Sequence, residues 1–394
     1  MLDLTRVLSG PHCGRMLADL GADVIKVEPP DGDMTRFSFP RINSIATYFT
    51  QQNCGKRNVS LDLRRPEAVE LLRRLAMRSD VVLENFRPGV MDRMGLGQQV
   101  LRSLNPRLVY CAITGYGLTG PWQHRRAYAP VIGAESGFTW LQCEGRDEVV
   151  NDPISHADVY TALEALAGVL AALHQRERTG EGQLVDVSMA ETMLSVNEHA
   201  HWHLMEGISG EDDVVSFQPG DYPVFTTADG RRVIVSGHPA ERGTFERYCR
   251  GVGRPELVGD ERFPDVRSRK RRLQELIAEL QVGASRFPSP EALEASLDEF
   301  GLAAGTVRTV TEIASSPWAA SRNAIVAVPD RRGGTIRIPN SPWHFSDAAS
   351  GVRGEPRYRG EDNRQVLREL LDLPDAEIDR LEADGVLASR VPPR

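Results

Sequence analysis

The sequence contains few cysteines, and none of them are spaced as pairs. Its 394 residues include five, without a C-x-x-C pair: Cys13, Cys54, Cys111, Cys143 and Cys249. This pattern fits neither a disulfide framework nor a zinc site built on cysteine pairs. We therefore expect reduced thiols and, because metal-binding and dinucleotide motifs are also missing, no metal and no permanently bound cofactor.

Long apolar runs and an excess of basic charge are also lacking. No apolar run approaches the roughly 18 residues that a bilayer crossing requires. Residues 1–6 have neither the apolar core nor the cleavage site of a signal peptide, so we predict a cytoplasmic protein without a membrane partner. The net charge of −8 argues against nucleic acid as a partner.

Three familiar site motifs are missing as well. Gly10 and Gly14 are present, but the G-x-G-x-x-G fingerprint is not, which disfavours a nicotinamide or flavin cofactor even though Glu28 ends the second predicted strand. His199 and His203 are four residues apart without H-E-x-x-H or a third ligand, so they indicate a polar helix face. No G-x-S-x-G elbow of a serine hydrolase occurs.

What is present is a regular alternation of short apolar strands and helices. Residues 1–30 read as strand, turn, helix and strand, and further strands are predicted at 58–64, 80–86, 107–117 and 184–189. Helices are predicted at 65–79 and 190–206, among others. The alternation predicts an α/β fold with a doubly wound, mostly parallel sheet.

The composition shifts near residue 207 and marks a second domain. Residues 207–221 are rich in Gly, Ser and acids and indicate a linker, and 222–237 predict a hairpin with a turn at Asp229-Gly230. We predict a large domain over 1–205 and a smaller α+β domain with its linkers over 206–325. A return strand and C-terminal helices over 326–394 would complete the large domain.

Basic and flat side chains follow several predicted strands. In an open α/β sheet the ligand crevice lies outside the carboxyl ends of the strands, where Lys56-Arg57, Arg64, Arg87, Arg93 and Arg126 could surround one pocket. Within "ENFRPG", residues 84–89, the amide of Asn85 and the ring of Phe86 follow the strand and could hold a flat heterocycle such as adenine. A solvated surface is the alternative for each arginine.

Asp158 stands at the start of a long apolar helix and has two possible roles. Ser155-x-x-Asp158 resembles a capping box, and spacing alone favours this role. The alternative is a nucleophile, because N–H groups in a first helical turn favour an ionised carboxylate. The two roles are compatible.

Several long motifs resemble the class III CoA-transferases, the CaiB/BaiF family that includes formyl-CoA transferase and α-methylacyl-CoA racemase. They are "VLSGPHCGRMLADLGADVIKVEPPDGDMTR" at 7–36, "GKRNVSLDL" at 55–63, "DVVLENFRPGVMDRMGLG" at 80–97 and "NPRLVYCAITGYGLTGP" at 105–121. The stretch at 157–189, which contains Asp158, and the closing "LRELLDLPDAEIDRLEADGVL" complete the resemblance. It covers essentially the whole chain.

The resemblance implies a Rossmann-like, CoA-binding large domain, a small domain and an interlocked homodimer. It also implies transfer of CoA from an acyl-CoA donor to a carboxylic acid acceptor. Asp158 would be the nucleophile and would pass through an acyl-aspartyl anhydride and an aspartyl-CoA thioester. The CoA contacts of the family fall on Leu8, Ser9, Leu61, Asp62, Leu63, Arg64, Asn85, Phe86, Arg87, Arg93, Arg126 and Tyr128.

The sequence departs from the family at three places. Pro29 stands where some members carry a phosphate-binding arginine, and Ala129 follows Tyr128 where many members have an acid. "SFQPGDYPV" at 216–224 replaces the glycine-rich loop of formyl-CoA transferases, so we expect no oxalate or formate specificity. Two alternatives stay open, namely a racemase or epimerase that uses Asp158 and His156, and a CoA-binding protein without turnover.

Overall fold

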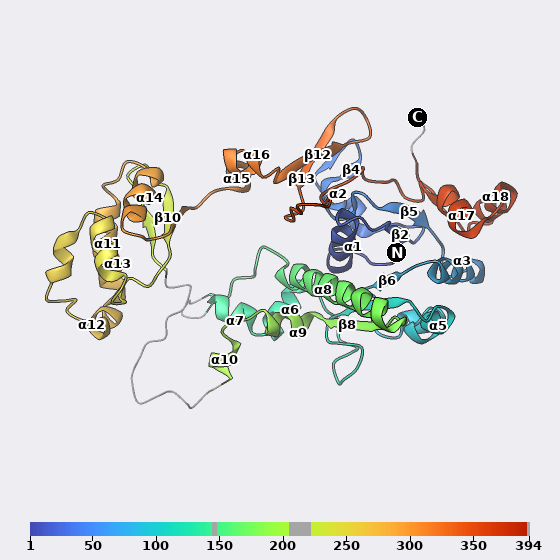
Figure 1. Ribbon diagram of the computed structural model, residues 1–394, viewed down its shortest axis with the longest axis horizontal. Coiled ribbons are helices and arrows are strands. Elements are labelled where there is room, and N and C mark those ends of the chain that lie inside the picture. Colours follow the sequence, from blue (N-terminus) through green and yellow to red (C-terminus); the bar gives the residue numbers. More distant parts are fainter. Residues whose placement is uncertain (144–147, 205–221, 392–394) are drawn as a thin grey trace. The chain divides into compact units, whose positions relative to one another are not determined.

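The computed structural model describes residues 1–143, 148–204 and 222–391, which fall into two compact units (Figure 1). The first unit comprises Met1–Leu204 and Ala319–Arg394, and the second comprises Met205–Trp318. The linker predicted at 207–221 lies outside the described residues. The same holds for most of the segment 216–224.

A six-stranded parallel sheet forms the centre of the first unit. Its strands are β1 (Leu2–Asp3), β2 (Ile25–Glu28), β5 (Arg57–Ser60), β6 (Val81–Glu84), β7 (Val109–Thr114) and β8 (Leu184–Ser188). They lie in the order β5-β2-β1-β6-β7-β8, and every pairing is parallel. The predicted parallel sheet is confirmed. The strand order reverses between β1 and β6, where doubly wound sheets bind their ligands.

Helices cover both faces of this sheet (Figure 1). On one face α1 (Ser9–Asp19) and α8 (His156–Thr179) bury Leu17 and Val169 against the strands. On the other face the helices are α3 (Pro66–Met77), α5 (Gln98–Leu104), α17 (Asn363–Leu371) and α18 (Asp375–Ala383). The two C-terminal helices therefore share the core of the N-terminal strands.

Helix α8 is the single described helix whose length and apolar composition would suffice to cross a membrane. Core helices of soluble folds meet the same criterion, and α8 packs Ala162, Ala165 and Val169 into the core formed with α1. Its other side carries Leu163 and Leu170, which are 42% and 43% exposed.

The first unit also contains short helices and strands outside the central sheet. They are η1 (Met34–Phe37), β3 (Arg41–Ile42), β4 (Ile45–Ala46), α2 (Thr47–Asn53), α4 (Val90–Arg93), α6 (Ala129–Glu135), α7 (Phe138–Cys143), α9 (Met189–Ser195), α10 (Ala200–His203), β12 (Ile325–Pro329) and β13 (Thr335–Pro339). The single helix predicted at 190–206 is wrong. Asn197 accepts the backbone N–H of His199 at 3.0 Å, a local turn that separates α9 from α10.

The second unit is a small α+β body. Three antiparallel strands, β9 (Val224–Thr226), β10 (Arg232–Val235) and β11 (Ala304–Thr306), pair in the order β11-β10-β9, so the predicted hairpin is confirmed. The helices of this unit are α11 (Phe245–Gly251), η3 (Pro255–Gly259), α12 (Val266–Arg271), α13 (Leu273–Ala284), α14 (Pro290–Glu299) and α15 (Val310–Ala314). Helix α16 (Pro317–Ser321) spans the boundary between the units.

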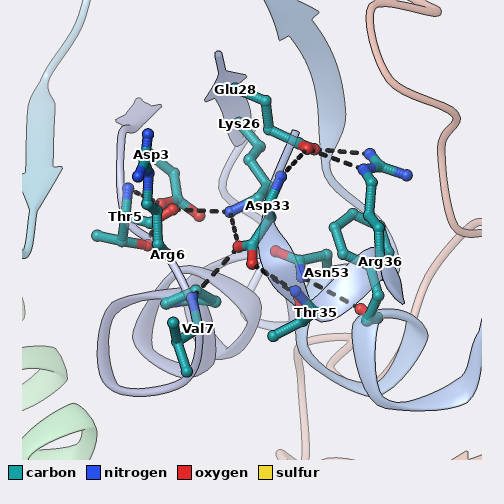
Figure 2. Close-up of polar contacts among 12 residues, drawn as sticks. Asp3, Thr5, Arg6, Val7, Lys26, Glu28, Asp33, Thr35, Arg36 and Asn53 are labelled. Carbon is teal, nitrogen blue, oxygen red and sulfur yellow. Dashed lines mark hydrogen bonds and ion pairs between the residues drawn. The ribbon is translucent and has the colours of Figure 1, made fainter. Parts of the chain in front are cut away.

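A cluster of buried charges lies under the ends of β1 and β2 (Figure 2). Lys56 Nζ donates to Asp3 Oδ2 at 2.8 Å, to Asn53 Oδ1 at 2.9 Å and to the Pro11 carbonyl at 2.8 Å. Lys26 Nζ donates to the Thr5 carbonyl at 2.9 Å. All three ammonium protons of Lys56 therefore have acceptors, as a buried charge requires.

Lys26 extends the cluster to Asp33. Its Nζ lies 3.2 Å from Asp33 Oδ2, and both side chains are 1% exposed. Asp3 lies at the other end of the cluster. Burial raises the pKa of Asp3, but the charges of Lys56 and Lys26 outweigh burial and bring the pKa below its ordinary value. We refer to Asp3, Lys26, Asp33 and Lys56 as the buried ionic cluster.

The variant Lys56→Met tests whether the buried ionic cluster stabilises the fold. It leaves the Asp3 carboxylate buried without its partner, so the free energy of unfolding should fall by about 3–5 kcal/mol. Urea unfolding measures the change. Lys270→Met is the matched control, because Lys270 pairs with the 45% exposed Glu241, and it should cost about 1 kcal/mol or less.

The double variant Asp3→Asn/Lys56→Met removes both charges. It should therefore be more stable than Lys56→Met alone. Equal losses in Lys56→Met and Lys270→Met would contradict a stabilising role for the cluster.

Candidate active site

Asp158 lies in the first turn of α8, but the contacts around it differ from those of a capping box. Ser155 at the N-cap makes no side-chain capping bond, so the predicted box is wrong. Instead, hydrogen bonding by the backbone N–H and the hydroxyl of Ser9 lowers the pKa of Asp158. Ser9 begins α1, directly after the turn that leaves β1. The carboxylate is therefore held across two helices at the point where the strand order reverses.

Burial and hydrogen bonding act on Asp158 in opposite directions. Burial raises the pKa of Asp158 above its ordinary value, and the two bonds from Ser9 lower it by less. The sequence led us to expect that the helix start would favour the ionised form. That expectation is wrong in its net direction, because desolvation outweighs the local donors. A poorly solvated carboxylate that keeps nearby donors suits a nucleophile.

The turn that carries Ser9 is held by polar contacts on both sides. Val7 has φ 67°, a conformation that β-branched residues rarely adopt. Its N–H donates to Asp33 Oδ2 at 3.3 Å (Figure 2). On the other side, the backbone N–H of Arg6 donates to Asn85 Oδ1, and Asn85 Nδ2 donates to the Arg6 carbonyl, both at 2.9 Å. Strained backbone persists only where surrounding contacts determine it.

Two glycines allow this turn to approach the cluster closely. A Cβ atom on Gly10 would lie 2.2 Å from Thr5 Cγ2, and one on Gly14 would lie 2.7 Å from Asp3 Oδ2. Neither distance is possible for a real side chain. Gly10 and Gly14 therefore allow α1 to pack closely against the cluster, and they do not form a dinucleotide-binding loop.

A cavity of about 420 Å³ opens beside Asp158. Predicted site residues on its wall are Ser9, Asn85, Phe86, Arg87, Tyr128 and Asp158. The sequence did not predict Arg6, Gln123 and Arg125, which also line it. The structure thus brings together residues from the ends of β1 and β6 and from the starts of α6 and α8.

A second cavity of about 530 Å³ continues from the first, and Arg6 and Phe86 line both. Its wall contains the predicted stretch Leu61, Asp62, Leu63 and Arg64, together with Pro29 and Pro30. Phe86 is fixed there because Glu84 accepts its backbone N–H at 2.7 Å. Glu84 is itself buried, and burial raises its pKa to about 8. The mostly apolar wall suits a flat ring.

Three predicted contacts lie on the wall of neither cavity, namely Leu8, Arg93 and Arg126. Leu8 is buried, and the two arginines are exposed. In the pair Arg125-Arg126 it is Arg125 that lines the cavity, where its guanidinium pairs with Glu135 and lies 4.6 Å from the Trp122 ring centre. The sequence "HRRAY" signals an arginine at this place but does not say which one.

Tyr48 on α2 is a further neighbour that the sequence did not reveal. Burial raises the pKa of Tyr48 to about 12, and the charges of Asp158 and Asp33 add to the effect. The phenol is therefore close enough to Asp158 to sense its charge. No motif marks Tyr48, because it reaches the site from a helix more than a hundred residues away in the chain.

His156 belongs to a different environment. Its Nδ1 bonds Asp152, and its ring stacks on Tyr160 with centres 5.3 Å apart. It lines a separate small cavity with Phe138, not the cavity that contains Asp158. His156 and Asp158 thus do not face one reacting atom. Within the described part of the chain, no three His, Cys, Asp or Glu side chains gather as metal ligands would.

Comparisons with known proteins agree with the resemblance seen in the motifs. The model of CoA-transferase family III matches residues 1–363. The succinyl-CoA–D-citramalate CoA-transferase of Chloroflexus aurantiacus is 32% identical over 391 residues, which is 98% of this chain and 96% of that protein. The formyl-CoA:oxalate CoA-transferase of Streptomyces avermitilis is 33% identical, and the match covers 98% of each protein.

A solved structure shows the same relationship. The crystal structure of a CaiB/BaiF family protein from Brucella suis superposes with a TM-score of 0.81 at 32% identity. The match covers 94% of this chain and 97% of that one. The predicted family is confirmed, and the chain belongs to CoA-transferase family III.

Proposed function

We propose that the protein is an acyl-CoA:carboxylate CoA-transferase whose nucleophile is Asp158. The observation that carries this proposal is the desolvated carboxylate of Asp158, bonded by Ser9 on the wall of a cavity at the switch point of the sheet. Relatives that are named CoA-transferases support an acyl-CoA donor and a carboxylic acid acceptor.

The first half of the reaction moves CoA onto the enzyme. A carboxylate oxygen of Asp158 attacks the thioester carbonyl carbon, the C–S bond breaks, and an acyl-aspartyl anhydride and CoA thiolate form. The thiolate then attacks the aspartyl carbonyl carbon of the anhydride. The donor acid leaves as its carboxylate, and the enzyme holds an aspartyl-CoA thioester.

The second half repeats these steps with the acceptor. The acceptor carboxylate attacks the aspartyl thioester, which releases CoA thiolate and forms a second anhydride. The thiolate attacks the acyl carbonyl of the acceptor, so that a new acyl-CoA forms and the Asp158 carboxylate is regenerated. Every step exchanges an oxygen and a sulfur nucleophile, without net proton uptake or redox change.

Ser9 has a role in the two steps in which the aspartyl carbonyl is attacked. Charge develops on the carbonyl oxygen of the aspartyl group when the anhydride or the thioester is attacked. Two donors that already point at the carboxylate can stabilise this charge without reorganisation. We also propose that CoA contacts the predicted residues on the two cavities and that the adenine lies beside Phe86. Contacts from Leu8, Arg93 and Arg126 remain predictions.

Neither alternative function has an observation in its favour. A racemase needs two bases on opposite sides of one carbon, and His156 is bonded to Asp152 in a separate cavity. A CoA-binding protein without turnover could retain Asp158, so the presence of this residue does not exclude it, and CoA binding without transfer by the wild type would favour it. The expectation that formate and oxalate are not substrates rests on residues 216–224 and stays a prediction.

The proposal includes a homodimer. It is supported by the outer side of α8, where Leu163, Ala167 and Leu170 form an exposed apolar strip. Light scattering of the purified protein should give twice the mass of one chain, and the mass of a single chain would contradict the dimer.

Asp158→Asn tests the nucleophile. The amide keeps the shape but cannot attack a thioester, so transfer should fall by roughly 10⁴-fold or more. Succinyl-CoA with a panel of dicarboxylate acceptors, followed by chromatography of the CoA esters, measures the rate. Glu164→Gln, an exposed change on the same helix, should retain the wild-type rate. Wild-type transfer by Asp158→Asn would refute the mechanism.

Ser9→Ala tests the electrostatic balance at Asp158. The nucleophile must be ionised, so kcat/KM should fall as the pH drops through the raised pKa of Asp158. Removal of the Ser9 hydroxyl takes away a bond that lowers this pKa, so the acid limb should move to higher pH. Ser103→Ala, on the exposed side of α5, serves as control. An unmoved acid limb, or one moved to lower pH, would contradict the balance.

A further inference from the structure

A third cavity, of about 280 Å³, lies beyond the second one and is unusually rich in arginine. Five of its lining residues are Arg36, Arg41, Arg357, Arg359 and Arg390, and Asp31 is the single acid among the described lining residues. We refer to it as the arginine cavity. Its charge contrasts with the net charge of −8 of the whole chain.

Two of these arginines are already neutralised. Arg36 binds Glu28 through two guanidinium nitrogens, at 2.8 and 2.6 Å (Figure 2). Arg357 lies 3.2 Å from a Glu355 oxygen and 3.4 Å from a Glu361 oxygen. These two side chains can line the cavity but have little charge left for a ligand.

Arg41, Arg359 and Arg390 are different. Across the described chain, no carboxylate lies within ion-pairing distance of these three guanidinium groups. Nε of Arg359 is buried and has no hydrogen-bond partner among the described residues. Arg359 Nη2 donates to the Ser389 carbonyl at 3.5 Å, so this half-buried guanidinium has one long hydrogen bond and no acid. An anion would supply a counter-charge and an acceptor for Nε.

Arg359 and Arg390 form a pair within the cavity. The backbone N–H of Arg390 donates to the Arg359 carbonyl at 2.9 Å. Burial lowers the pKa of Arg359, and the charges of Arg390 and Arg36 lower it further. The charges of Glu28 and Asp31 act in the opposite direction. Two like charges held together by the backbone make a site for a doubly charged anion that accepts several hydrogen bonds.

The three cavities form a row. The cavity of Asp158 shares Arg6 and Phe86 with the second cavity, and the second shares Asp31 with the arginine cavity. CoA is an elongated molecule with the thioester at one end and an adenosine that carries a 3′-phosphate at the other. If the thioester lies at Asp158 and the adenosine in the second cavity, the phosphate falls at the arginine cavity.

We propose that Arg359 and Arg390 bind the 3′-phosphate of CoA and so select CoA over its 3′-dephospho form. The inference rests on the proposed function, because it uses the same bound CoA. Pro29 and Pro30, which line the second cavity, carry no charge for this phosphate. Arg359 packs beside Gly32, with its Cδ 3.6 Å from the position of a Cβ there, so its stem lies next to Asp31.

Titration calorimetry with CoA and with 3′-dephospho-CoA tests this assignment without requiring turnover. The wild-type protein should bind CoA more tightly by roughly ten- to a hundredfold, the range for one charge-assisted contact. In Arg359→Ala/Arg390→Ala this preference should shrink towards one. The Kd of CoA should rise, while that of 3′-dephospho-CoA stays unchanged.

Further variants separate this result from a loss of folding. Arg390→Ala alone changes an exposed side chain and should reduce the preference in part, whereas Arg78→Ala, exposed on the same unit, should retain it in full. Equal weakening of both ligands, an unchanged preference in the variants, or no preference in the wild type would overturn the assignment alone. Binding of neither ligand by the wild type would overturn the proposed function with it.

Discussion

The ion pair between Lys26 and Asp33 is the contact on which the geometry of the active site depends. Asp33 binds Lys26 through an oxygen that also accepts the Val7 N–H, and Lys26 binds the Thr5 carbonyl. Together these bonds hold a strained turn whose next helix begins at Ser9. Removal of any one partner would leave a buried charge unpaired, which is strongly destabilising. A fully paired buried network of this kind holds the turn rigidly.

This support places Ser9, which contributes to the balance at Asp158. Desolvation makes the carboxylate a better nucleophile but also favours its neutral form, and the two bonds from Ser9 offset part of that cost. A Ser9 displaced by a small shift of the turn would leave the carboxylate buried without donors. The buried ionic cluster and the Asp158 carboxylate are thus linked through the turn, although the residues come from β1, β2, η1, the start of β5 and α8.

The sequence predicted what depends on local pattern. Alternating strands and helices gave the parallel sheet, and residues after strand ends, such as Asn85 and Phe86, were expected at the crevice where they lie. Contacts between distant segments could not be predicted. Ser9 takes the place of the expected cap, Tyr48 approaches from α2, and the neighbour of Arg126 lines the cavity instead. In each case the spacing within one element says nothing about which side chain of another element comes close.

In the proposed reaction CoA is bound covalently to Asp158 during each turnover. Mass spectrometry of the tryptic peptide 147–176 after incubation with succinyl-CoA and a hydroxylamine quench tests it most directly. We expect an aspartyl hydroxamate at Asp158 that forms only when the acyl-CoA is present. An unmodified Asp158 under conditions of turnover, or a hydroxamate on another residue, would contradict it.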